Sequence, residues 1–139
     1  MQRPERIRAV KLAPNKPAEE VILTNTLEGL QAAVAEGADY GMIEFVRLEG
    51  NESLMLHEES KILGLEANRR LSSFGFDVRD VRCGTIYIVA DYYDEEAEDT
   101  YLVDLPEDRV KFYLEAYKEP EQIDEEEVFH SICMEFFGL

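Results

Sequence analysis

Alternating apolar and polar positions in the first half of the chain predict two β-hairpins. Each hairpin has two strand-like segments joined by a turn sequence, PNKP in the first and GN in the second. A fifth strand, residues 84–90, is almost continuously apolar, which indicates a central strand covered on both faces. Residues 71–82 follow no clear period and stay unassigned. The four hairpin segments are residues 7–12, 20–23, 42–48 and 53–57.

Apolar residues at helical spacing predict three helices, each preceded by a residue able to cap its N-terminus. The first helix places Leu27, Leu30 and Val34 on one apolar stripe. The last helix carries a broader apolar surface, which either packs on the sheet or forms a surface for a dimer or another partner. The three candidate caps are Asn25, Asp104 and Asp124.

These elements predict a single small α+β domain, with a mostly antiparallel sheet of about five strands and about three helices. The core is expected in residues 1–118. Residues 119–139 are expected to be a C-terminal helical extension, packed on the core or at an interface. The sequence has no apolar run long enough to span a bilayer and no signal-peptide-like segment, so the expected location is the cytoplasm, without membrane contact.

The charge of the chain is strongly negative and uneven. Its formal net charge is −17, and residues 91–139 contain seventeen acidic residues and three basic ones. Phosphates of a bound duplex must be met by Lys and Arg, so we expect no direct nucleic-acid binding. The same charge would attract a basic surface on another protein, although it is also explained by solubility alone.

One acidic run stands out after the fifth strand and is the candidate partner-binding surface. A calcium loop needs a turn-forming glycine among its ligands, and no glycine occurs between Gly84 and Gly138, so we expect no metal. Closely spaced acids also occur simply as a solvated loop. The candidate residues are Asp94, Glu95, Glu96, Glu98 and Asp99.

Residues typical of catalysis are few, and they follow no catalytic spacing. The chain has two histidines and two cysteines, and it lacks a GxSxG elbow, a P-loop and a dinucleotide-binding glycine pattern. Cys83 and Cys133 fit small hydrophobic residues better than a disulfide or zinc site. We therefore expect no catalytic residues, no cofactor and no enzyme activity.

A cationic cluster surrounds a Gly-Leu turn in the middle of the chain. A lysine, two arginines and an amide could together hold a phosphate or carboxylate, or they could pair with neighbouring acids. The candidate ligand-binding residues are Lys61, Asn68, Arg69 and Arg70.

This cluster carries a resemblance to a known family. The EESK segment at residues 58–61, Gly64-Leu65, Asn68-Arg69 and the Gly84-Thr85 step into a strand and acidic loop resemble the family catalogued as domain of unknown function 3846, found mainly in phage and plasmid genomes. The resemblance covers about residues 6–117 and implies a mobile-element accessory role, directed against host defence. The chain departs from the family pattern at His57, Ser60, Glu66 and Thr85.

Three functional hypotheses follow. The first is a non-enzymatic phage or plasmid accessory protein that sequesters or blocks a host defence protein through its acidic surface or an anionic-ligand pocket. The second is a sponge for a small anionic, nucleotide-like signal, held by the cluster around Arg69. A small phosphohydrolase ranks last. A homodimer through the C-terminal helix is a further hypothesis.

Overall fold

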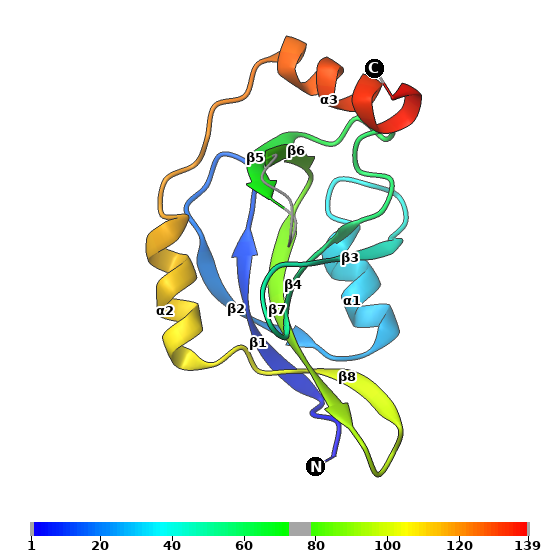
Figure 1. Cartoon of the computed structure of the whole chain (residues 1–139), viewed down its shortest axis with the longest axis vertical. Coiled ribbons are helices and arrows are strands. Elements are labelled where there is room, and N and C mark those ends of the chain that lie inside the picture. Colours follow the sequence, from blue (N-terminus) through cyan, green and yellow to red (C-terminus); the bar gives the residue numbers. More distant parts are fainter. Residues whose placement is uncertain (1, 73–78, 139) are drawn as a thin grey trace.

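The computed structural model describes residues 2–72 and 79–138, and Figure 1 shows them arranged around one central sheet. The six-stranded main sheet has the order β2-β1-β7-β4-β3, with β8 paired to the second half of β7, and every pairing is antiparallel. The elements are β1 (Arg6–Leu12), β2 (Glu19–Thr24), α1 (Leu27–Val34), β3 (Ile43–Arg47), β4 (Glu52–His57), β5 (Ala67–Ser72), β6 (Arg79–Cys83), β7 (Ile86–Asp94), β8 (Asp99–Val103), α2 (Glu107–Ala116) and α3 (Glu125–Phe137).

The predicted α+β class, with a mostly antiparallel sheet, a small single domain and a C-terminal helix, is confirmed. The two predicted hairpins are β1–β2 and β3–β4. The unassigned segment contains part of a separate two-stranded ribbon, β5–β6, whose connection at residues 73–78 lies outside the described residues. Among the described helices, none is long and apolar enough to cross a membrane.

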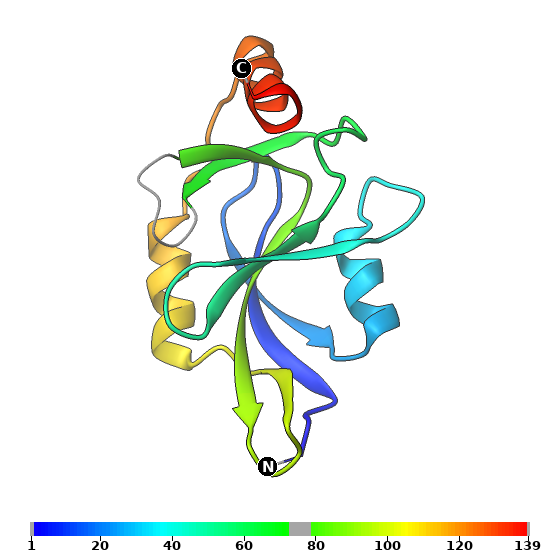
Figure 2. The same ribbon diagram turned by 45° about the vertical axis from the view of Figure 1, so that its right-hand side comes forward.

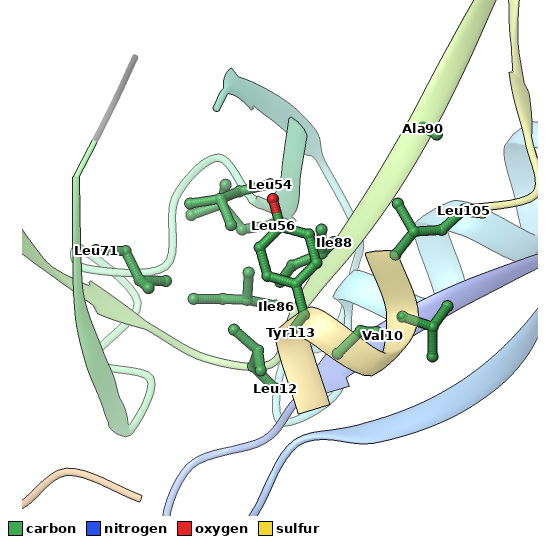
Figure 3. Packing of buried hydrophobic residues seen from close by; sticks show 11 residues of the cluster. Val10, Leu12, Leu54, Leu56, Leu71, Ile86, Ile88, Ala90, Leu105 and Tyr113 are labelled. Carbon is green, nitrogen blue, oxygen red and sulfur yellow. The ribbon is translucent and has the colours of Figure 1, made fainter. Parts of the chain in front are cut away.

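β7 is the central strand, and its first five residues, 86–90, are buried on both faces. It lies between β1 and β4, and Ile88 is the register partner of Val10 on one side and of Leu54 on the other. These residues belong to the core cluster that α2 covers through Val110 and Tyr113 (Figure 3). Alternate positions of β7 point to the opposite face, where α1 covers them. The second cluster is Ile7, Ala9, Leu23, Leu30, Val34, Met55, Tyr87 and Val89.

The start of α1 differs from the prediction. Thr26, not Asn25, is the N-cap, because its Oγ1 accepts a hydrogen bond from Gly29 N at 3.0 Å. Asn25 is buried and donates through Nδ2 to the carbonyls of Pro4 and Leu102, at 2.8 and 3.1 Å. Leu27 is 66% exposed, so the first residue of the predicted buried stripe faces outward.

The caps of the other two helices give one correction and one confirmation. Asp104 does not cap α2: its Oδ1 accepts a hydrogen bond from Arg8 N at 2.7 Å, and Pro106 stands at the N-cap without a side-chain hydrogen bond. Asp124 caps α3 as predicted, accepting from Glu127 N at 2.8 Å. Gly138 ends α3 in the left-handed conformation, with φ 70°.

Candidate functional site

Arg69 of the predicted ligand cluster is 1% exposed and binds other parts of the chain. Its guanidinium donates to the carbonyls of Ala13, Lys16 and Tyr117, at 3.2, 2.5 and 3.3 Å. Burial lowers the pKa of this guanidinium, and the charge of Glu121 offsets part of the effect. Because Tyr117 is the C-cap of α2, Arg69 places its charge at the negative end of that helix. Arg69 thus joins the β1–β2 turn to α2.

Asn68 is fully buried and joins the β5–β6 ribbon to the main sheet. Its Nδ2 donates to the carbonyls of Leu12 and Gly84, both at 2.7 Å, and its Oδ1 accepts from Arg69 at 2.6 Å. A buried amide with its donor and acceptor both engaged orders the surrounding backbone. This geometry indicates a structural role for Asn68.

The other two cations of the cluster contact acidic side chains. Arg70 binds Glu127 of α3, with Nε 2.8 Å from Oε2 and Nη2 2.9 Å from Oε1. Lys61 is buried, and its Nζ lies 2.8 Å from Asp80 Oδ2. The ligand-binding prediction for these residues stays a prediction. The internal partners of all four side chains give more support to the alternative in which they pair within the fold.

The glycines of this region shape the packing around Leu65. Gly84 has φ 79°, and a Cβ atom there would lie 3.0 Å from Leu65 Cδ1. Gly64, just before Leu65, also has a positive φ, of 70°. Gly64 is therefore favoured by its backbone conformation alone. Gly84 is favoured by its backbone conformation and by the lack of space for a side chain.

Asp80 is a residue that the sequence reasoning missed. It lies on β6, and its carboxylate accepts hydrogen bonds from Lys61 Nζ at 2.8 Å and Ser131 Oγ at 2.6 Å. Burial raises the pKa of Asp80, but the hydrogen bonds from Lys61 and Ser131 outweigh burial and hold the pKa below its usual range. Its segment has no clear hydrophobic period, so no local signal pointed to it.

The predicted acidic loop is the turn of the β7–β8 hairpin, where Asp94 pairs with Asp99. Asp94 itself is buried: its Oδ1 accepts from the Glu96 and Ala97 N–H groups at 3.1 and 3.2 Å, and its Oδ2 accepts from the Tyr101 hydroxyl at 3.2 Å. The bond from Ala97 is the largest influence on its pKa, and with those from Tyr101 and Glu96 it holds that pKa below the usual range. Asp94 therefore orders the turn through its own hydrogen bonds, and its part in a partner-binding surface stays a prediction.

The remaining four acids form an exposed surface, which we call the acidic hairpin tip. They are Glu95, Glu96, Glu98 and Asp99, and none of them forms an ion pair within the described part of the chain. Residues 83–108 contain no Lys or Arg, so the negative charge of the tip has no basic neighbour along the strands. Tyr92 and Tyr93 are exposed on the same hairpin.

Within residues 2–72 and 79–138, no group of three or more His, Cys, Asp or Glu side chains is placed to hold a metal ion.

Comparison with protein families decides the relationship that the motifs suggested. The model described as "Domain of unknown function (DUF3846)" matches residues 7–118. The chain belongs to the DUF3846 family. The DUF3846 region holds the cationic cluster and the β7–β8 hairpin, and it ends just after α2, so α3 lies beyond the match. Neither the curated proteins nor the solved structures give a match to this DUF3846 chain.

Proposed function

We propose that this DUF3846 protein acts by binding, and that its acidic hairpin tip docks on a basic surface of a partner protein. The observation that carries the proposal is the β7–β8 hairpin, which projects at one end of the molecule (Figure 1). Its tip carries four exposed acids that form no ion pair with the other residues the structure describes. Hydrogen bonds from Glu96 N and Ala97 N to Asp94 order the turn, so the backbone that carries the tip acids is ordered before binding. Preorganised charge of this kind increases association rate and specificity.

The net charge of −17 supports the same proposal at long range. A basic cleft that normally receives nucleic acid would attract this protein, whereas nucleic acid itself would be repelled. The family resemblance adds the proposal that the protein belongs to a phage or plasmid and blocks a host defence protein in the bacterial cytoplasm. The internal contacts of Arg69 and its neighbours give less support to the nucleotide-binding alternative.

The test compares two variants with the same net charge. The tip variant carries Glu95→Gln, Glu96→Gln, Glu98→Gln and Asp99→Asn. The control variant carries Asp39→Asn, Glu58→Gln, Asp108→Asn and Glu119→Gln, at exposed sites outside the β7–β8 hairpin. Immobilised wild type captures partners from nuclease-treated bacterial extract, and the captured protein is then purified and titrated against all three forms.

We expect the tip variant to bind the purified partner at least about tenfold more weakly than the control variant. Wild-type affinity should fall steeply between about 50 mM and about 500 mM NaCl, because exposed charges are screened. Duplex DNA should compete for the same partner. Equal affinity of the two variants would show that the hairpin tip is not the binding surface.

A further inference from the structure

Helix α3 is attached to the protein with its polar side inward. Ser131 is its buried residue, and the side chains on the same face bind the ribbon and the loop after β4. Glu127 pairs with Arg70 at 2.8 Å, Ser131 donates to Asp80 at 2.6 Å, and Glu135 lies 3.9 Å from Lys61. A surface helix ordinarily turns its apolar stripe toward the core. In α3 this orientation is reversed.

The outward side of α3 is aromatic. Phe129 is 67% exposed and Phe137 is 70% exposed, and Phe136 is also exposed. Phe129, Cys133 and Phe136 are spaced by four and three residues, so they fall on one face, opposite Ser131. Cys133 is half-buried between the two exposed phenylalanines, and exposed aromatic side chains on one helical face are typical of a docking surface.

A groove of about 560 Å³ runs along one flank of this aromatic row. Val128, Phe129 and Ile132 line it from α3, and the chain around Gly64 and Ala67 forms its other wall. Its remaining lining includes three acids and, among the residues that the structure describes, no Lys, Arg or His. The acids are Glu66, Glu121 and Glu125. Glu66 accepts a hydrogen bond from the Asn15 amide, and Glu121 accepts one from Arg70 N at 2.6 Å and lies 3.8 Å from Arg70 Nη1.

We propose that the aromatic face of α3 and this groove bind an amphipathic helix that carries basic residues, supplied by a partner protein. The apolar side of such a helix would cover the phenylalanines, and its Lys or Arg side chains would meet the glutamates at the rim. In helix-in-groove recognition the bound helix presents apolar residues at three- and four-residue spacing. Phe129, Cys133 and Phe136 have the same spacing on α3, so the apolar rows of the two helices can pack along each other.

A second copy of this chain fits the surface less well. The first turn of α3 holds three glutamates, and its last turn holds no basic residue. Parallel pairing of two α3 helices would place these glutamates beside each other. Antiparallel pairing would place them beside the negative end of the partner helix. Neither arrangement supplies a cation, and each copy carries a net charge of −17.

This inference does not depend on the acidic hairpin tip. Figures 1 and 2 show α3 and the β7–β8 hairpin at opposite ends of the molecule. Variants of one surface therefore leave the other intact, and the two proposals fail or succeed separately.

The experiment uses a fluorescein-labelled peptide of about 18 residues, with leucine along one helical face and lysine elsewhere. A scrambled peptide of the same composition has the same charge and no apolar face. The full chain is compared with a Phe129→Ser/Phe136→Ser/Phe137→Ser variant. The control variant is Ile22→Ser/Leu27→Ser, which removes exposed apolar residues from β2 and α1. All three proteins carry the same net charge, and circular dichroism checks that they are folded.

We expect the amphipathic peptide to bind the wild type and the Ile22/Leu27 control alike, and to bind the phenylalanine variant at least about tenfold more weakly. The scrambled peptide should bind all three proteins equally weakly. Equal binding of the amphipathic peptide to all three proteins would overturn the proposal, because charge alone would then explain it. Sedimentation showing a wild-type dimer that the phenylalanine substitutions dissociate would also overturn it, in favour of self-association. Binding of wild type to lipid vesicles with no binding of the peptide would assign the face to a membrane and reject the proposed helix.

Discussion

Glu52, on β4, is a buried carboxylate in a strongly acidic protein. Two side chains of α2 bind it: the Arg109 guanidinium supplies the opposite charge, with Nε 2.6 Å from Oε2, and the Tyr113 hydroxyl donates to Oε1 at 2.5 Å. Burial raises the pKa of Glu52, but the hydrogen bonds from Arg109 and Tyr113 outweigh burial and hold the pKa below its usual range. At the scale of single residues, this contact attaches α2 to the sheet.

We expect Glu52→Gln to lower the free energy of unfolding by about 1–3 kcal/mol at about pH 7, because Arg109 loses its charged partner. A lowered folded-state pKa stabilises the fold above the ordinary glutamate pKa of about 4.3, and this stabilisation is lost as the pH falls through the folded-state value. The difference between wild type and variant should therefore shrink at acidic pH. Urea unfolding of both proteins across a pH series measures this difference in the free energy of unfolding.

Glu107→Gln is the control for this prediction. Glu107 and Lys111 form an exposed pair at 3.6 Å, which is expected to contribute less than about 0.5 kcal/mol. A Glu52→Gln effect that is no larger than the control, or that does not change with pH, would contradict the role assigned to the Glu52 carboxylate.

Helix α3 is the element with the weakest attachment. Its buried contacts are polar, and it contributes no residue to either hydrophobic cluster among the described residues. The Asp80 carboxylate accepts hydrogen bonds from Ser131 of α3 and from Lys61 of the loop after β4. One carboxylate of the ribbon therefore anchors both segments. Individual hydrogen bonds contribute about 1 kcal/mol each, so we expect α3 to open locally before the sheet does.

Ser131→Ala should selectively loosen α3. The substitution removes the hydrogen bond to Asp80, and the opening free energy of the α3 amides should fall by about 1 kcal/mol. Amides of β1 and β7 should keep their protection, because their hydrogen bonds lie in the main sheet. Native-state hydrogen exchange measures both sets, with His130→Ala, an exposed neighbour on the same helix, as the control. An equal loss of protection in β7 would argue against local opening.

The whole molecule is a sheet covered by α1 on one face and α2 on the other, with α3 beyond one end (Figure 2). Both hydrophobic clusters are complete within residues 7–117 of the described chain. The contacts between Arg69 and the β1–β2 turn also lie within that range. The predicted division into a 1–118 core and a 119–139 extension stays a prediction that this arrangement favours.

A chain that ends at residue 118 should therefore fold alone. We expect cooperative urea unfolding and a free energy of unfolding about 1–3 kcal/mol below that of the full chain, since the contacts of Glu127 and Ser131 are lost. Near-ultraviolet circular dichroism of the buried tyrosines reports whether packing is retained. The full-length Glu127→Gln/Ser131→Ala double variant should show a smaller loss, because it keeps the hydrogen bond from Arg70 N to Glu121 that truncation removes. A truncated chain without a cooperative transition would make residues 119–139 part of the folding unit.

Local patterns in the sequence predicted most of the fold. The β1–β2 and β3–β4 hairpins, the central β7 strand and the Asp124 cap depend on period, turn residues and adjacent donors, which are all short-range features. The caps at Asn25 and Asp104 were wrong because more distant groups, Leu102 and Arg8, bind these side chains in the fold. A local sequence motif does not show that a distant group will bind the side chain of a predicted cap.

The candidate sites likewise depend on partners that lie far away in the sequence. The sequence grouped Lys61, Asn68, Arg69 and Arg70 by nearness in the chain, yet their partners come from β1, β6, α2 and α3. Asp94 belonged to the predicted acidic surface, and its turn geometry directs it inward. The other four acids of the hairpin tip are exposed, as a run of like charges predicts.

The sequence by itself determined the α+β class, the family, the net charge of −17 and the positions of most strands and helices. These properties depend on composition and on interactions between residues a few positions apart. The tertiary structure alone decided which charges are buried and paired, and which side of α3 faces outward. Those outcomes depend on partners such as Arg70 and Glu127, which are 57 positions apart in the chain and meet only when the ribbon and α3 come together.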